Sequence, residues 1–485
     1  MAQELTLELD TMSQLVDPSK VELRSLEGRE ALSRPYELDL TLEVTEDGGL
    51  SDEALDDLLR MPCRVQYGRG TGVEVHGVLA WIEMLSTAAP TPVLYRARLV
   101  PRLWLASRTR RSRIFQDLDV AGIVKAVLEE LGLEEDTHFA FELASSPPVS
   151  EYTVQYQETD LDFLHRLLEH AGIAYHFVQE PDGERVVFGD ANEAFAPLAE
   201  HETLEYTPGE AAELAGVREL RRRLTPGPQG VMLRDYNWRT PSVGLQSEAP
   251  ADRVTGRGFV AGYGDHFKTP AEGGALAAVR AQEHLATRDV YHGRCRITAL
   301  RPGHRFGLMG HPVAGLDRDY LVTATEYTVD ARGVEVDGGL GTDLRFTAIP
   351  FDVVYRPPRR TPKPRIAGVM HARIDGAVPG TAAPIDELGR YKVLFPFDLV
   401  GEPGGRASRW VRLAQPASGA GYGIHFPLHI GAEVAIAHVD GDPDRPIIMN
   451  SPPNAETITP VSEQNATQSQ IITQTGIRLT WDDDC

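Results

Sequence analysis

The chain has 485 residues and a formal net charge of −23, from 48 Lys and Arg against 71 Asp and Glu. Hydrophobic residues make up 42% and charged residues 25%, which excludes a mostly disordered chain and indicates about three folded domains. An acidic protein repels phosphate backbones and anionic lipid, which argues against nucleic acid and membrane surfaces as partners. No apolar run approaches the length of about 18 residues that a membrane helix needs.

The start of the chain and its cysteines indicate folding in a reducing cytosol. The first residues, MAQELTLELD, carry acids where a signal peptide carries basic residues and an apolar run, so we expect no signal peptide. Cys63, Cys295 and Cys485 are far apart and match no disulfide framework and no zinc spacing. We therefore expect no metal and no other cofactor.

The first part of the chain alternates between strands and a few helices. VELRSLEG, YELDLTLEV and VEVHGVLAWIEML alternate apolar and polar residues, as half-buried strands do. Apolar residues within 120–131 and within 159–171 share one helical face, and Gly132 and Gly172 follow as left-handed caps. A third helix is expected near 271–287. Because these elements do not alternate as βαβ units, the predicted class is mainly β with a few helices (α+β).

Two breaks in composition divide the chain. RPPRRTPKPR at 356–365 holds four prolines and five basic residues, which indicates an extended linker, with a proline-rich surface loop as the alternative. Residues 366–458 contain about five short strands with glycine-rich turns, typical of a small closed barrel. After that the sequence becomes polar and rich in Thr and Gln. The predicted domains are therefore 1–355, the linker, 366–458 and 459–485.

One helical motif resembles a zinc site. His165 and His170 in HRLLEH are five residues apart, about 140° around a helix, whereas helical zinc motifs place two histidines four apart on one face. We interpret HRLLEH, with its Glu169, as part of a solvated helix.

A second motif resembles a calcium loop. Asp440, Asp442 and Asp444 match its first three ligand spacings, but Arg445 and Ser451 occupy the positions of its glycine and its glutamate. Asp residues and a proline are also what a tight turn needs. A hairpin turn is the better interpretation.

Motifs for nucleotide binding and catalysis are not found. Gly256, Gly258 and Gly262 miss the GxGxxG spacing by one residue and do not lie between a strand and a helix. There is no GxSxG elbow, although a serine triad built from distant residues stays open because triads are recognised by geometry. We assign no catalytic, cofactor-binding or metal-binding residues and expect no enzyme.

Two arginine clusters raise the question of nucleic acid. They comprise Arg102, Arg108, Arg110, Arg111 and Arg113, and Arg218, Arg221, Arg222 and Arg223. The barrel-like segment 366–458 holds 7 Lys and Arg against 10 Asp and Glu, or 7 − 10 = −3, whereas a strand-binding groove is positive. Salt bridges to acidic neighbours are the preferred interpretation.

Several longer segments carry a resemblance to a known family. SRIFQDLDVAGIVKAVLEELGL, EYTVQYQETDLDFLHRLLEHAGIAYHF, RPGHRFGLMGHP, VVYRPPRRTPKPRIAGVMHARIDG and WVRLAQPASGAGYGIHFPLHIGAEVAIAHVDGDPDRPII follow one another in the chain. In kind and order they resemble the VgrG proteins, the spikes of bacterial type VI secretion systems and relatives of contractile phage tail hub-and-spike proteins. The two segments beginning EYTVQY and WVRLAQ are the most specific.

The resemblance implies an architecture and a set of partners. Residues 1–355 would be a hub of two barrel-like β halves, 366–458 an OB-fold neck, and 459–485 the start of an intertwined trimeric β-helix. The implied partners are two further copies of the chain, a hexameric Hcp-like tube protein, a PAAR-type tip protein, effectors or their adaptors, and baseplate components. The implied protein is a structural spike that is assembled in the bacterial cytoplasm and leaves through the contractile apparatus, crossing a target membrane by mechanical force.

The tail supplies a candidate trimer interface. In SQIITQTGIRLTW the apolar residues have no core of their own, and exposed strands aggregate unless they are paired. The candidate interface residues are Ile471, Ile472, Ile477, Leu479 and Trp481. A frayed C-terminal tail is the alternative.

Other functions remain as alternatives. The spike of an extracellular contractile injection particle or of a phage tail would have the same architecture. An effector hydrolase would need a further domain with a catalytic motif, and an OB-type nucleic-acid binder would need a positive groove.

Overall fold

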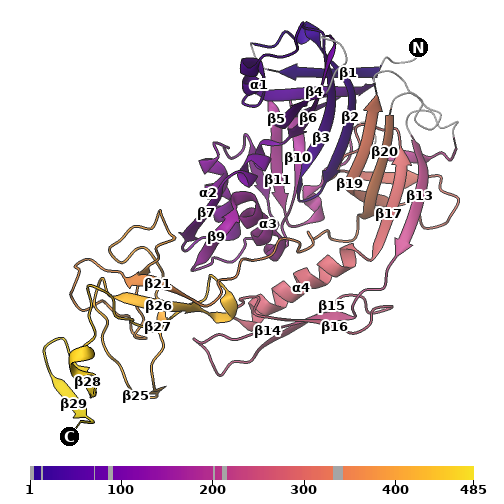
Figure 1. The fold of residues 1–485 in the computed structure, drawn as a ribbon. Coiled ribbons are helices and arrows are strands. Elements are labelled where there is room, and N and C mark those ends of the chain that lie inside the picture. Colours follow the sequence, from indigo (N-terminus) through magenta and orange to yellow (C-terminus); the bar gives the residue numbers. More distant parts are fainter. Residues whose placement is uncertain are drawn as a thin grey trace. The chain divides into compact units, whose positions relative to one another are not determined.

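The computed structural model describes residues 5–11, 15–69, 72–85, 91–199, 202–209, 216–330 and 342–484. The chain divides into two compact units. The first comprises Met1–Thr109, Val120–Pro148 and Thr159–Pro362, and the second comprises Arg110–Asp119, Val149–Glu158 and Lys363–Cys485. The second unit therefore includes two segments that precede the proline-rich stretch. Figure 1 shows the elements of each unit.

The first half of unit 1 is an open, antiparallel, six-stranded sheet. Its order is β1-β4-β5-β6-β3-β2. In β3 the apolar Tyr36, Leu38 and Leu40 are buried at every second position, as the alternating sequence predicts. The bounds are β1 Leu5–Thr11, β2 Val21–Ala31, β3 Arg34–Val44, β4 Pro62–Arg69, β5 Val73–Met84 and β6 Val93–Val100, with α1 Asp52–Leu58, η1 Pro18–Lys20 and η2 Arg102–Ser107 beside them.

The second half is a closed, six-stranded barrel. The order β19-β18-β12-β13-β17-β20 closes because β20 also pairs with β19, and β19 pairs with β2 of the first half. The predicted mainly β fold is thus confirmed, with the second half a closed barrel and the first an open half-barrel. The bounds are β12 Thr203–Tyr206, β13 Gly216–Leu224, β17 Asp289–Cys295, β18 Arg305–Met309, β19 Asp319–Asp330 and β20 Thr342–Pro350.

A buried polar group joins the two halves. Glu30 on β2 accepts hydrogen bonds from the Tyr327 hydroxyl at 2.7 Å and from the Arg301 guanidinium at 2.7 and 2.9 Å. All three residues are buried, so the carboxylate is compensated by an opposite charge and a hydroxyl.

Two smaller sheets carry the three predicted helices. The first has the order β10-β11-β8 and contacts α3 where His165 stacks on Tyr175 of β10, and α2 contacts α3. The second has the order β15-β14-β16 and packs on α4. Gly132 and Gly172 follow α2 and α3 with φ of +78° and +73°, which confirms the predicted left-handed caps. The bounds are α2 Val120–Glu130, β8 Phe139–Glu142, α3 Asp160–Ala171, β10 Ala174–Glu180, β11 Gly183–Gly189, η3 Asn192–Ala194, β14 Gly230–Asp235, β15 Leu245–Pro250, β16 Phe259–Tyr263 and α4 Pro270–Ala286.

The solvated-helix interpretation of HRLLEH is wrong for three of its four polar residues. His165, Arg166 and Glu169 on α3 are buried, whereas His170 is partly exposed. The His165 ring stacks on Tyr175 and its Nε2 lies 2.7 Å from the Tyr175 hydroxyl, while burial lowers the His165 pKa to about 3. Polar partners from distant parts of the chain make this burial possible, and the helical pattern alone does not reveal them.

Glu169 fixes the proline-rich stretch to unit 1. One oxygen of the Glu169 carboxylate accepts hydrogen bonds from the Arg34 guanidinium and from the Thr361 hydroxyl, each at 3.0 Å. The other accepts from the backbone N–H groups of Arg360 and Thr361 at 2.9 and 2.8 Å. Arg356 adds bonds to Gln282 and to the Gly172 carbonyl. Residues 356–361, although without regular secondary structure, are therefore held in place.

Unit 2 is built around a five-stranded sheet of order β22-β21-β26-β27-β23. Three two-stranded pairs accompany this sheet, namely β7-β9, β24-β25 and β28-β29. The bounds are β7 Arg110–Phe115, β9 Thr153–Thr159, β21 Val369–Ile374, β22 Val393–Leu394, β23 Arg412–Leu413, β24 Ser418–Gly419, β25 Tyr422–Gly423, β26 Glu433–His438, η4 Val439–Gly441, β27 Pro446–Asn450, η5 Glu463–Asn465, β28 Gln468–Ile472 and β29 Arg478–Asp482.

Replacing Glu169 should destabilise unit 1. In Glu169→Gln the new amide N–H₂ group would face either the Arg34 guanidinium or two backbone N–H donors, so buried donors lose their acceptor. We expect a loss of about 2 kcal/mol in the free energy of unfolding, measured by urea denaturation. Asp162→Asn, at an exposed position on the same helix, should cost less than about 1 kcal/mol. Equal losses in the two variants would contradict this role of Glu169.

Candidate assembly interface

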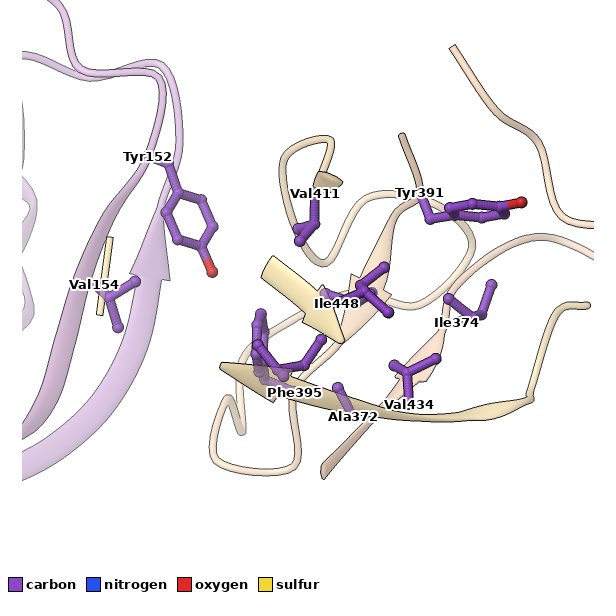
Figure 2. Close-up of a cluster of buried hydrophobic side chains, with 11 residues drawn as sticks. Tyr152, Val154, Ala372, Ile374, Tyr391, Phe395, Val411, Val434 and Ile448 are labelled. Carbon is purple, nitrogen blue, oxygen red and sulfur yellow. The ribbon is translucent and has the colours of Figure 1, made fainter. Parts of the chain in front are cut away.

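The core of unit 2 includes side chains from the β7-β9 pair. Tyr152, just before β9, and Val154 on β9 are buried against the five-stranded sheet (Figure 2). The sheet side of this cluster comprises Ala372, Ile374, Tyr391, Val393, Phe395, Val411, Val434, Ile436 and Ile448. The β7-β9 pair is therefore part of the hydrophobic core of unit 2, and removing it would expose that core to water.

A carboxylate secures the same pair. Asp444 accepts a hydrogen bond from the Val154 backbone N–H at 2.7 Å and lies 2.6 Å from the Lys363 ammonium. Asp442 is also 2.6 Å from that ammonium and accepts from the Asp444 N–H. With Asp440 at a φ of +54°, these residues form the turn between β26 and β27. The predicted hairpin turn is thus present, and its carboxylates bond to protein donors.

Arg409 connects the turn between β26 and β27 to Tyr152, which precedes β9. Its guanidinium donates to the Asp444 carbonyl at 2.8 Å, and its Cζ lies 5.0 Å from the centre of the Tyr152 ring. Burial raises the pKa of Tyr152, and its hydroxyl has no hydrogen-bond partner within the described residues. Tyr152 therefore contributes to the core through its ring and not through its hydroxyl.

The C-terminal hairpin β28-β29 exposes an apolar face. Its register places Ile471 opposite Leu479 and Ser469 opposite Trp481, so these side chains share one side, and Ile477 precedes Leu479 on that side. The relative exposures are 40% for Ile471, 72% for Ile477, 52% for Leu479 and 51% for Trp481. Four of the five residues predicted for the interface therefore lie on one exposed face.

Ile472 differs from the other four residues. It pairs with Arg478 on the opposite side of the hairpin, in line with the Gln470–Thr480 pair, and it is only partly exposed. The alternating pattern of the sequence could have separated it from its neighbour Ile471, because successive strand residues point to opposite faces.

The hairpin is attached to loops of unit 2 at its turn. Gln474 lies 2.5 Å from a ring nitrogen of His429 through its Oε1 and donates to the Gly380 carbonyl at 3.2 Å. At the other end Thr467 and Gln468 donate to the Asp482 carboxylate, each at 2.9 Å. An isolated two-stranded hairpin is marginally stable in water, so these contacts hold the apolar face in a defined place.

Burying this face is the largest driving force for association that the tail offers. Each Ile or Leu side chain that leaves water contributes about 1.5–3 kcal/mol, and Trp481 adds a large aromatic surface. Elsewhere in unit 2, Tyr422 on β25 and Ile424 and Phe426 after it are also exposed. These surfaces point to association with other polypeptide.

The arginine clusters are used largely within the protein. Arg102 pairs with Glu184 at 3.0 Å, Arg221 with Glu219 at 3.0 Å, and Arg222 with Asp289 through two bonds of 2.8 Å. In contrast, Arg110 and Arg113 donate to the Gln157 carbonyl and the Gln155 side chain, which are not acids. The salt-bridge interpretation therefore holds for part of each cluster.

The glycines of the loose nucleotide motif lie before and within β16. Gly256 and Gly258 precede this strand and Gly262 lies inside it, so they do not form a turn between a strand and a helix.

The helices in the described ranges include none that is long and apolar enough to cross a membrane.

Two substitutions at Tyr152 should separate packing from hydrogen bonding. Tyr152→Ala leaves a cavity and should lower the free energy of unfolding of unit 2 by about 3–5 kcal/mol. Tyr152→Phe removes only a buried hydroxyl without a partner and should stay within about 1 kcal/mol of the wild type. Urea denaturation followed by near-ultraviolet circular dichroism measures both. A large loss in the Phe variant would show that the hydroxyl is needed.

Family models match both units of the chain. Residues 29–333 match the model described as phage tail baseplate hub (GPD). Residues 379–451 match the model described as the type VI secretion system/phage-baseplate injector OB domain. The second match lies on the five-stranded sheet of unit 2.

Individual relatives give the same result. The type VI secretion system spike protein VgrG4b of Pseudomonas aeruginosa is 31% identical over 450 residues, covering 89% of this chain and 55% of the relative. VgrG1a of the same organism is 31% identical over 470 residues, covering 93% and 70%. The solved structure of E. coli c3393, described as a type VI component similar to the phage T4 tail proteins gp27 and gp5, matches with a TM-score of 0.68 and 25% identity over 92% of this chain and 100% of that chain.

The chain spans 55% of the length of VgrG4b and 61% of VgrG1b. Within that span the hub model, the OB model and the relatives agree with the two barrel-like halves and the five-stranded sheet. The chain belongs to the phage tail baseplate hub family and, within it, to the VgrG spike proteins of type VI secretion.

Proposed function

We propose that the protein is a non-enzymatic structural component of a type VI secretion apparatus, in which three copies form the spike. The observation that carries the proposal is the exposed apolar face of the β28-β29 hairpin, in a chain whose relatives are spike proteins. Three hairpins packed around a common axis would remove these faces from water and pair their free strand edges. The residues at that axis are Ile471, Ile477, Leu479 and Trp481, with Ile472 on the outer side.

The proposed division of labour follows the domain boundaries expected from the sequence. Residues 1–355 serve as the hub, 366–458 as the neck, and 459–485 as the start of the spike, with 356–365 between hub and neck. The neck also uses the β7-β9 pair, because Tyr152 and Val154 belong to its core.

Symmetry supports a hexameric tube as the hub's partner. Each chain contributes two barrel-like halves, so three chains present six similar halves to a six-fold ring. In the same proposal, baseplate components surround the hub, and a PAAR-type tip protein and effectors or their adaptors associate with the spike. The assembled particle forms in the bacterial cytoplasm and leaves through the contractile apparatus.

The mass in solution tests the proposed assembly. At micromolar concentration the full chain of 53.3 kDa should form a trimer of about three times that mass, measured by native mass spectrometry and light scattering. Leu479→Glu places a charge on the apolar face in all three copies and should leave mainly monomer, because burying an unpaired charge is costly.

The adjacent position supplies the control. Thr480→Glu introduces the same charge on the opposite face of the same strand and should remain trimeric. A wild-type chain that stays monomeric across micromolar concentrations contradicts the proposal. A trimer that survives Leu479→Glu as well as Thr480→Glu would place the interface elsewhere in the chain.

A further inference from the structure

The small sheet of unit 1 has one protected and one unprotected edge. Its order is β15-β14-β16, with β14 and β16 parallel (Figure 1). At one edge, β15 carries Glu248 and ends in Pro250, both of which discourage pairing with another strand. At the other edge, β16 reads Phe-Val-Ala-Gly-Tyr, without a charge or a proline.

The backbone groups that face outward from β16 can be assigned from its bonds. Gly258 accepts from Gln229, and Gly264 donates to the Arg234 carbonyl, so the even-numbered residues face β14. In a parallel pair the intervening residues face the other way. Phe259, Ala261 and Tyr263 therefore direct their N–H and C=O groups away from the sheet.

The same three residues occupy the open face of the sheet. The other face packs on α4 through Val231, Leu233 and their neighbours. Phe259 lies opposite Gly230 and Tyr263 lies opposite Arg234 in the register, and their side chains are 51% and 66% exposed. Two aromatic side chains thus lie beside a row of outward-facing backbone groups.

The charges around this edge are positive. Arg253 and Arg257 precede β16, and Arg234 lies beside its end, all exposed and without an ion-pair partner among the described residues. The acids close to them in sequence are engaged, since Asp252 pairs with Arg288 and Asp265 pairs with Arg359. In a chain of net charge −23, such a local excess of unpaired arginine is a specific feature.

We propose that β16 binds an extended segment of a partner protein, in which acidic residues alternate with apolar ones. The segment adds a strand to the edge through the backbone groups of Phe259, Ala261 and Tyr263. Its apolar side chains pack beside Phe259 and Tyr263, and its acids pair with Arg234, Arg253 and Arg257. The site lies outside the C-terminal hairpin, so this interaction goes beyond the assembly proposed above.

A synthetic peptide of this pattern tests the proposal. Fluorescein-labelled EVEFEVE and its charge-reversed counterpart KVKFKVK are titrated with the full-length chain, and binding is followed by fluorescence anisotropy. The acidic peptide should bind about tenfold more tightly than the basic one, and added salt should reduce this preference. Absence of saturable binding of EVEFEVE up to about 1 mM would overturn the proposal.

Variants at one position separate the edge from the rest of the fold. Ala261→Pro removes an outward-facing N–H without touching the bonds to β14, and should weaken binding of EVEFEVE about tenfold. Ala261→Val keeps that N–H and should bind within about twofold of the wild type. If Ala261→Pro does not fold, the double variant Arg234→Glu and Arg257→Glu replaces it and should reverse the preference between the two peptides.

Two results would refute the assignment. Ala261→Pro binding EVEFEVE as tightly as Ala261→Val would show that the edge is not used. A change in the mass of the assembly on Ala261→Pro, with no change on Ala261→Val, would show that another copy of this chain occupies the edge.

Discussion

The hydrophobic core of unit 2 depends on a strand pair that lies far away in the sequence from the rest of that core. Tyr152 and Val154 fill part of this hydrophobic core. Asp444 holds the β7-β9 pair by accepting a hydrogen bond from the Val154 backbone N–H. Nine of the eleven buried residues of this core follow Pro362, and the added pair supplies the other two. Residues 149–158 are therefore part of the packing of unit 2.

Two strand pairs of unit 2 differ in how their apolar faces are covered. The β7-β9 pair buries Tyr152 and Val154 within its own unit, whereas the β28-β29 hairpin directs Ile477, Leu479 and Trp481 to solvent. The same physical requirement, that apolar strand faces leave water, is met by intrachain packing in the first case and, in the proposed trimer, by further copies of the chain in the second. This contrast supports the proposed trimer.

The spacing of apolar residues and the residue types at turns were sufficient to predict several elements of the fold. The helices ending before Gly132 and Gly172 and the turn at Asp440 are local, and local patterns predict them well. The burial of Glu169 could not be predicted, because its partners Arg34 and Thr361 lie more than a hundred residues away. The sequence predicted which apolar residues of the tail are exposed. That Ile472 points to the opposite face from Ile471 was assigned only from the register of the two strands.

The most direct test of whether the apolar face of the β28-β29 hairpin is an interface is amide hydrogen exchange of that hairpin, followed as a function of protein concentration. Exchange at residues 468–482 should slow as concentration rises into the range in which trimers form, since pairing with other copies protects the strand edges. Exchange in the β21-β26 ladder of the neck should not depend on concentration. A hairpin that exchanges at the same rate at every concentration, while the mass in solution shows a trimer, would contradict the account.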